Sequence, residues 1–195
     1  VFYKNALPNE IPQMSVGLLL DESGSMCSCD RCTYARSSAI ILYDFCKALH
    51  IPVTVYGHST SGSSVALYSY AEFESIDNDD KYRMMDIAAR GSNRDGAALR
   101  FVAEQLVKRP EEVKILILVS DGQPAAPGYY GSAAEEDLRG IKQEYRRKGV
   151  LFIAAAIGED KQNIERIYGD SFMDITDLNQ LPVKLTAAVK RHMRV

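Results

Sequence analysis

The stretch Ser15-Val-Gly-Leu-Leu-Leu-Asp-Glu-Ser-Gly-Ser25 decides the fold. Its first six residues are a short apolar run, which is typical of a strand buried on both faces of a sheet. An acid and two hydroxyls follow at alternate positions, as Asp21, Ser23 and Ser25. Alternate side chains of an extended segment point to the same side, so these oxygens can converge at the carboxyl end of the strand. Gly24 lets the backbone turn there without steric cost.

Outward from this stretch, strand-like and helix-like patterns alternate along the chain. Apolar residues recur at three- and four-residue steps over 33–49, which predicts an amphipathic helix. Two strand-like runs follow, 53–58 and 65–73, and only Ser, Thr and Gly residues separate them. So short a connection cannot carry a parallel crossover, so the two runs should form an antiparallel hairpin.

The remaining elements complete the alternation. Strands are predicted at 113–119, 150–157 and 172–175, and Gly149 should cap the helix before the second of them. The other helices are predicted at 81–89, 97–108, 133–148, 162–168 and 181–192. The fold class is therefore α/β, a three-layer α/β/α open sheet of about six strands, mostly parallel with one antiparallel edge strand.

Length and composition favour a single domain that spans residues 1–195. Hydrophobic residues make up 46% and charged residues 25% of the chain, which suits a globular protein with a full core. The net charge of −3 argues against nucleic acid as the partner. The sequence has no apolar run of about 18 residues, so we expect no membrane insertion. Because the sequence does not start with Met, we expect a piece of a longer protein.

Four cysteines, Cys27, Cys29, Cys32 and Cys46, fall in one quarter of the chain. They are too few and too local for a secreted disulfide framework, so we expect a reducing, cytoplasmic setting. The first three could suggest a zinc or iron–sulfur site, or a labile disulfide. The prediction is a loop with reduced thiols, since Cys46 should lie on a buried helix face too far away to be the fourth ligand.

A second acid ends the next strong strand in the same way as the first. Asp121 follows the apolar run 113–119, and ligand sites in open α/β sheets lie beyond the carboxyl ends of the strands. Asp21 and Asp121 should therefore face each other. A third polar loop, Gly91–Gly96, adds Asn93 and Asp95 as oxygen donors, although Asp95 is also a candidate N-cap of the next helix. Simpler interpretations remain: helix capping for the first cluster and an ordinary turn for Asp121.

Hard oxygen ligands of this kind suit Mg²⁺, with Mn²⁺ or Ca²⁺ as alternatives. Two carboxylates leave the ion able to attract a further carboxylate, so the pattern predicts binding of a partner protein through one of its acidic residues. An enzyme is not expected, because the chain lacks the phosphate-loop, dinucleotide and nucleophile-elbow motifs. The alternative is a Mg²⁺-dependent phosphotransferase or phosphatase, which would need a second acid where Ser23 stands.

Taken together, Asp21-x-Ser23-x-Ser25, the polar loop and Ser120-Asp121-Gly122 resemble the metal-ion-dependent adhesion site of von Willebrand factor A (vWA) domains. The resemblance covers essentially the whole chain. It implies that Asp21, Ser23, Ser25, Asn93, Asp95 and Asp121 form the metal site. The family's second loop usually supplies a Thr, and here Asn93 stands at that place.

Within the family, Asp21–Met26, Asn93–Gly96 and Ser120–Pro124 look most like the C-terminal domains of bacterial NorD-type and CobT proteins. This resemblance implies a C-terminal domain of an accessory protein that acts beside an AAA+ ATPase of the MoxR or chelatase type. Its role would be the activation or maturation of a metalloenzyme such as nitric oxide reductase, or that of a cobaltochelatase-like subunit. As a hypothesis, Tyr129 and Tyr130 flank the metal and contact the partner; anchoring their own loop is the equal alternative.

Overall fold

A six-stranded sheet in the order β3-β2-β1-β4-β7-β8 forms the centre of the domain in this computed structural model. The structure describes residues 13–28, 30–75, 77–122, 124–157 and 161–175, together with 177, 180, 183, 184 and 187. The strands of the sheet are β1 (Met14–Asp21), β2 (Val53–Ser61), β3 (Ser64–Ala71), β4 (Val113–Ser120), β7 (Val150–Ala156) and β8 (Phe172–Asp174).

The apolar run that ends at Asp21 is the central strand. β1 pairs in parallel with β2 on one side and β4 on the other, and β4, β7 and β8 continue in parallel. β3 pairs antiparallel with β2 and forms the edge, so the predicted hairpin and edge strand are confirmed. The hairpin turn is tighter than predicted, because β2 continues to Ser61 and only Gly62 and Ser63 lie between the strands.

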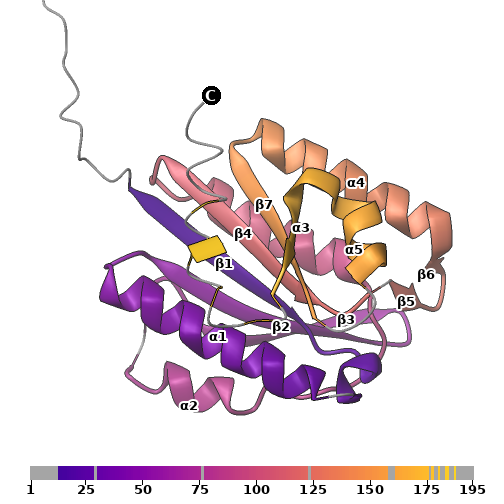
Figure 1. Cartoon of the computed structure of the whole chain (residues 1–195), viewed down its shortest axis with the longest axis horizontal. Helices are drawn as coiled ribbons and strands as arrows, with labels where there is room; N and C mark the ends of the chain where they lie inside the picture. Colours follow the sequence, from indigo (N-terminus) through magenta and orange to yellow (C-terminus); the bar gives the residue numbers. More distant parts are fainter. Residues whose placement is uncertain are drawn as a thin grey trace, which may run out of the picture.

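Helices cover both faces of the sheet, as the three-layer prediction requires (Figure 1). One core joins the sheet to α1 (Arg31–Ala48) and to Met84 of α2 (Asp80–Met84). The other core lies under α3 (Asp95–Val107), α4 (Gly131–Arg147) and α5 (Lys161–Tyr168). Every apolar residue of β1 from Val16 to Leu20 is buried, which explains why this strand lacks a polar alternation.

Several boundaries differ from the sequence expectation. Helix α2 is shorter than the predicted 81–89, and a turn follows it. Gly149, at φ +85°, follows the end of α4 and accepts the left-handed conformation that a capping residue needs, as predicted. Most of the expected last helix, 181–192, lies outside the described residues, as do residues 1–12, Cys29 and His192.

The loop between β4 and α4 contains structure that the sequence did not reveal. Strands β5 (Ala125–Ala126) and β6 (Tyr129–Tyr130) pair antiparallel to form a small hairpin.

Two short 3-10 helices complete the described structure: η1 (Gly24–Cys27) follows β1, and η2 (Gly169–Ser171) precedes β8. No helix in the described part of the chain is both long and apolar enough to cross a membrane.

Gly17 is the point of closest approach between the sheet and α3, and it yields a prediction about stability. A Cβ at Gly17 would lie 2.7 Å from Cγ1 of Val102 and 3.0 Å from Cδ1 of Leu106. We expect Gly17→Ala to lower the free energy of unfolding by about 1–3 kcal/mol through overpacking. Gly140→Ala is the control: nothing lies within 4 Å of that exposed helical position, so it should stabilise by about 0.5–1 kcal/mol. Urea unfolding monitored by circular dichroism measures both, and equal effects would refute the assignment.

Candidate metal centre

Three loops meet at the carboxyl ends of β1, β2 and β4. The first follows β1, the second is the segment 90–94 before α3, and the third follows β4. The six metal-site candidates of the sequence analysis lie in these loops or next to them, with Asp21 at the end of β1 and Asp95 at the start of α3. Five of these side chains are 4% exposed or less, and Ser25 is the exposed member of the set. The structure therefore brings all six to one end of the sheet.

Asp21, the last residue of β1, is the centre of this arrangement. Its Oδ1 accepts a hydrogen bond from the backbone N–H of Ser23 at 2.8 Å. Its Oδ2 accepts one from Nδ2 of Asn93 at 2.8 Å and one from Oγ of Ser120 at 2.9 Å. Each of the three loops thus donates to the same buried carboxylate, and Asp21 fixes their relative positions.

A chain of oxygen contacts connects the first loop to Asp121. The hydroxyls of Ser23 and Ser25 lie 3.0 Å apart, and Ser25 donates to Oδ1 of Asp121 at 3.0 Å. The other oxygen of Asp121 accepts a hydrogen bond from Nη1 of Arg31 at 2.7 Å. Asp121 therefore belongs to the same cluster as the first loop. Capping does not explain that loop, because Ser23 precedes η1 without a side-chain capping bond and Asp30 is the N-cap of α1.

Burial and mutual repulsion make both acids costly in their charged form. Burial raises the pKa of Asp21 above its ordinary 3.8, and the charge of Asp95 raises it further. Burial also raises the pKa of Asp121, followed by the charge of Asp21, although Ser25 and Arg31 counteract the shift. A group of buried carboxylates that disfavour their own charge is an environment in which a cation binds favourably.

The free lone pairs of the cluster fit a small hard cation. A carboxylate oxygen offers two acceptor positions. Oδ2 of Asp21 uses both, whereas Oδ1 accepts one hydrogen bond, from Ser23, and retains another position. The hydroxyls of Ser23 and Ser25 and Oδ1 of Asp121 lie along the same chain. These donors are hard oxygens, so they would hold Mg²⁺ or a similar ion, with Asp121 acting directly or through water.

The second loop is held by backbone pairing on both sides. Ser92 forms an antiparallel bridge with Thr60 at the end of β2, and Asn93 forms one with Ala125 of β5. Two backbone hydrogen bonds join this second loop to the first loop: the N–H of Gly24 donates to the carbonyl oxygen of Gly91, and the N–H of Arg90 donates to that of Glu22. Asn93, at the place of the family's usual Thr, donates to Asp21 while its buried Oδ1 has no hydrogen-bond partner. This orphaned oxygen is a further candidate donor to the ion.

Asp95 does not cap α3, contrary to the N-cap expectation. The helix starts at Asp95 itself, its N-cap position is Arg94, and no side chain caps it. Asp95 instead lies against His58, with 3.1 Å between Oδ1 and Nε2 in a contact that lacks the alignment of a hydrogen bond. Burial alone would lower the pKa of His58, but Asp95, Asp21 and Glu22 outweigh it and raise this pKa above 6.5.

An ion pair between the buried Glu22 and the exposed Arg90 holds the first loop in place. Glu22 is 1% exposed, and its carboxylate accepts hydrogen bonds from the hydroxyl of Tyr70 at 2.6 Å and from Nε of Arg90 at 2.7 Å. Its position depends on Gly57, because a Cβ there would lie 1.8 Å from Oε1 of Glu22. The Arg90 guanidinium also lies 4.2 Å from the centre of the Tyr68 ring.

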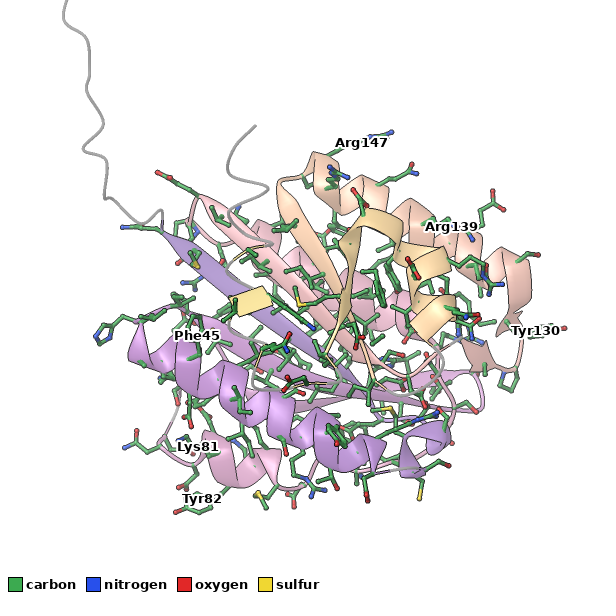
Figure 2. All side chains as sticks on the ribbon, in the orientation of Figure 1. Phe45, Lys81, Tyr82, Tyr130, Arg139 and Arg147 are labelled. Atoms are coloured by element: carbon green, nitrogen blue, oxygen red, sulfur yellow. The ribbon has the colours of Figure 1, made fainter. Side chains whose placement is uncertain are left out.

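The two tyrosines of the β5–β6 hairpin have different environments. Tyr129 donates to Oδ2 of Asp137 on α4 at 2.7 Å and lies over Gly96, where a Cβ would be 2.4 Å from its hydroxyl. Tyr130 is 69% exposed and points away from the body of the domain (Figure 2). Tyr129 thus anchors the hairpin, while Tyr130 is exposed to solvent.

The described cysteines give no support to a thiolate metal site. Cys27, Cys32 and Cys46 are free, and burial raises the pKa of the Cys46 thiol to about 12. A neutral thiol is a poor metal ligand, which agrees with the exclusion of Cys46 as a fourth ligand. Within the described residues, no group of three or more His, Cys, Asp or Glu side chains is arranged to hold a metal; Cys29 lies outside them.

Sequence reasoning missed five residues: Ser120, Arg31, His58, Glu22 and Arg90. Ser120 and His58 had a detectable signal. Ser120 ends β4, and His58 ends the strand predicted at 53–58, although β2 continues to Ser61; the register places His58 directly beside Asp21. Arg90, the partner of Glu22, and Arg31, the partner of Asp121, had no signal in the sequence. The directions of their side chains depend on the loops from which they come.

The fold and these loops define a von Willebrand factor A-type domain. A solved structure titled "von Willebrand factor type A from Catenulispora acidiphila" superposes with a TM-score of 0.59 over 87% of this chain and 40% of that chain, at 18% identity. Residues 80–193 match the family model described as "Cobalamin biosynthesis protein CobT VWA domain", and the chain belongs to this family. The predicted resemblance to CobT and NorD is confirmed.

Two curated relatives place the chain among larger proteins. "Uncharacterized protein YojO" of Bacillus subtilis (strain 168) is 25% identical over 98% of this chain, which spans 32% of that protein. "Protein NorD" of Brucella suis biovar 1 (strain 1330) is 34% identical over 48% of this chain and 15% of its own length. The chain therefore covers a third or less of the length of these relatives.

The Glu22 ion pair predicts a stability effect. Glu22→Gln keeps the size of the side chain but leaves Arg90 without its carboxylate, so we expect the free energy of unfolding to fall by about 1.5–3 kcal/mol. Glu104→Gln is the control, because Glu104 pairs with Lys148 at a surface where both side chains are exposed. Chemical denaturation measures the difference, and an equal loss in the two variants would contradict it.

A second pair of variants tests the roles of the hairpin tyrosines. Tyr129→Phe removes the hydrogen bond to Asp137 and should lower the free energy of unfolding by about 1.5 kcal/mol. Tyr130→Ala should change it by less than about 0.5 kcal/mol, because the side chain is exposed. Thermal unfolding of both variants provides the comparison. The anchoring role of Tyr129 is wrong if its hydroxyl can be removed at no cost.

Proposed function

We propose that this domain binds one divalent cation, Mg²⁺ or Mn²⁺, and uses it to bind an acidic side chain of a partner protein. The observation that carries the proposal is the continuous contact from Ser23 through Ser25 to Asp121, beside the buried carboxylate of Asp21. Asp21, Ser23 and Ser25 would hold the ion, Asp121 would join directly or through water, and Asn93 would add its unpaired oxygen. Asp95, which lies against His58, would add a further carboxylate to the site.

The chemistry of such a site favours an external carboxylate. Hydroxyl ligands bring no charge, so they leave a divalent ion more electrophilic than a shell of carboxylates would. Ser25 is the exposed member of the cluster, and the open side of the ion would therefore face solvent near Ser25. Tyr130, exposed on the hairpin that pairs with Asn93, would supply additional contact area to the partner.

We further propose that the parent protein is a bacterial cytoplasmic accessory factor that acts with an AAA+ ATPase of the MoxR or chelatase type. The relation to NorD supports a role in activation of a metalloenzyme such as nitric oxide reductase. The match to the CobT domain family supports a cobaltochelatase-like subunit as the second candidate. In both cases this domain would connect the ATPase to its target without itself performing chemistry.

A phosphotransferase function has less support. The position two residues after Asp21, where such enzymes need an acid, is Ser23. We expect no hydrolysis of p-nitrophenyl phosphate in Mg²⁺, and turnover that disappears in Asp21→Asn would favour the enzyme instead.

The decisive variant is Asp21→Asn. Wild-type protein should gain about 2.7 kcal/mol of stability at a Mg²⁺ or Mn²⁺ concentration one hundred times Kd, and Asp21→Asn should gain none. Without metal, Asp21→Asn removes a costly buried charge but also loses an acceptor oxygen that the three loops share, so the stability of each protein in chelator is the reference for its own metal-induced gain. Asp44→Asn, at an exposed ion pair with Lys81, is the control.

Calorimetry and thermal unfolding, each with metal and with chelator, measure these effects. Equal metal binding by wild type and Asp21→Asn would refute the site. The partner step is tested by interferometry with a purified AAA+ ATPase of the MoxR type. We expect binding in Mg²⁺ that is lost with chelator and in Asp21→Asn; equal capture with chelator would contradict a metal-mediated contact.

A further inference from the structure

We infer that His58 is a positioning residue of the metal centre: its imidazole holds the Asp95 carboxylate in the place from which this acid reaches the ion. The inference rests on the proposed function and concerns a residue that the adhesion-site pattern does not include. Nε2 of His58 lies 3.1 Å from Oδ1 of Asp95, and the two side chains are 0% and 3% exposed. Bulk solvent does not reach this contact, so the direction of the carboxylate depends on protein groups.

The sheet holds His58 rigidly. Its backbone in β2 is paired with Asp21 of β1 on one side and with Leu67 of β3 on the other. Its carbonyl oxygen also accepts a hydrogen bond from the backbone N–H of Glu22 at 2.9 Å. A ring attached to the interior of the sheet beside Asp21 is a fixed point against which a neighbouring carboxylate can be oriented.

Asp95 has no such support of its own. It is the first residue of α3, and no side chain caps this helix. Its carboxylate is close enough to raise the pKa of Asp21 by its charge, so the two acids lie within range of one cation. The contact with His58 is short but not aligned as a hydrogen bond, so a small rotation of the carboxylate is enough to align it.

Three acids act on the charge of the imidazole, and Asp95 is the one that His58 can position. Asp95, Asp21 and Glu22 all raise the pKa of His58. Glu22 is paired with Arg90, and the carboxylate of Asp21 accepts hydrogen bonds from all three loops. The neutral ring with a proton on Nε2 and the charged ring both have an N–H at this position, so the role does not depend on the charge of the ring.

A double-mutant cycle tests the inference, with the Mn²⁺ affinity of the whole chain measured by calorimetry. We expect His58→Leu to bind Mn²⁺ about 10- to 100-fold more weakly than wild type, as is typical when the group that orients a metal ligand is removed. Asp95→Asn should also bind Mn²⁺ more weakly. Adding His58→Leu to Asp95→Asn should change the affinity by no more than about twofold, because a group that acts through Asp95 then has no carboxylate to position.

A second pair of variants keeps a polar side chain at position 58. The amide nitrogen of Gln can reach the place of Nε2, whereas the shorter side chain of Asn cannot. We expect His58→Gln to stay within about threefold of wild type for Mn²⁺, and His58→Asn to bind as weakly as His58→Leu. Both variants bury an amide at the same position, so their comparison decides the question even if His58→Leu does not fold.

Gly17→Ala is the control for a general loss of stability. It strains β1 against α3 at a distance from the metal centre, so it should weaken the fold and leave Mn²⁺ affinity as in wild type. Near-ultraviolet circular dichroism of each variant confirms that the protein titrated is folded.

Three results would overturn the inference while the site around Asp21 stands. They are unchanged Mn²⁺ affinity in folded His58→Leu or His58→Asn, losses that multiply in the double variant, and wild-type affinity in Asp95→Asn. The first would leave His58 and Asp95 as a structural pair, and the second would mean that His58 acts independently of Asp95. Failure of wild type to bind Mn²⁺ would instead refute the proposed function itself, so the two failures are distinguishable.

Discussion

The whole end of the sheet depends on a single buried carboxylate that three loops share. Asp21 accepts hydrogen bonds from the first loop, from Asn93 of the second and from Ser120 at the end of β4. A buried charged acceptor is tolerable only when its lone pairs are used, so the loops gain a common position from the need to satisfy it. The parallel strands bring the loops near one another, and Asp21 determines how they meet.

The fold could be predicted because its signals are local and redundant. The buried run before Asp21, the short link between β2 and β3 and the alternation of elements each pointed to the same mixed sheet, and the structure confirms it. The prediction missed the structure of the loop between β4 and α4, where local sequence preference indicates neither strand nor helix. The hairpin of β5 and β6 has strands of two residues each, too short to show any periodicity, and it is held by Asn93 and Asp137 rather than by its own sequence.

The candidate site also has a part that the sequence predicts and a part that it does not. Asp21, Ser23, Ser25 and Asp121 follow from strand ends and alternation, so the sequence was sufficient to place them together. The groups that compensate the charges of Asp121 and Glu22 could not be predicted, because a positive partner such as Arg31 or Arg90 can come from any segment that passes close to the acid. For Asp95 the local rule of helix capping competed with a long-range contact, and the buried contact with His58 won over the cap.

The second loop has a consequence for how this type of site can change over time. Its main chain is fastened through Thr60 on one side and Ala125 on the other, so backbone pairing holds its course together with the hydrogen bond from Asn93 to Asp21. A hydroxyl at position 93 could replace the amide as a donor to Asp21 while the backbone pairing stays the same. A scaffold of this kind allows the oxygen atoms that face Asp21 to change by single substitutions while the surrounding strand pairing stays intact.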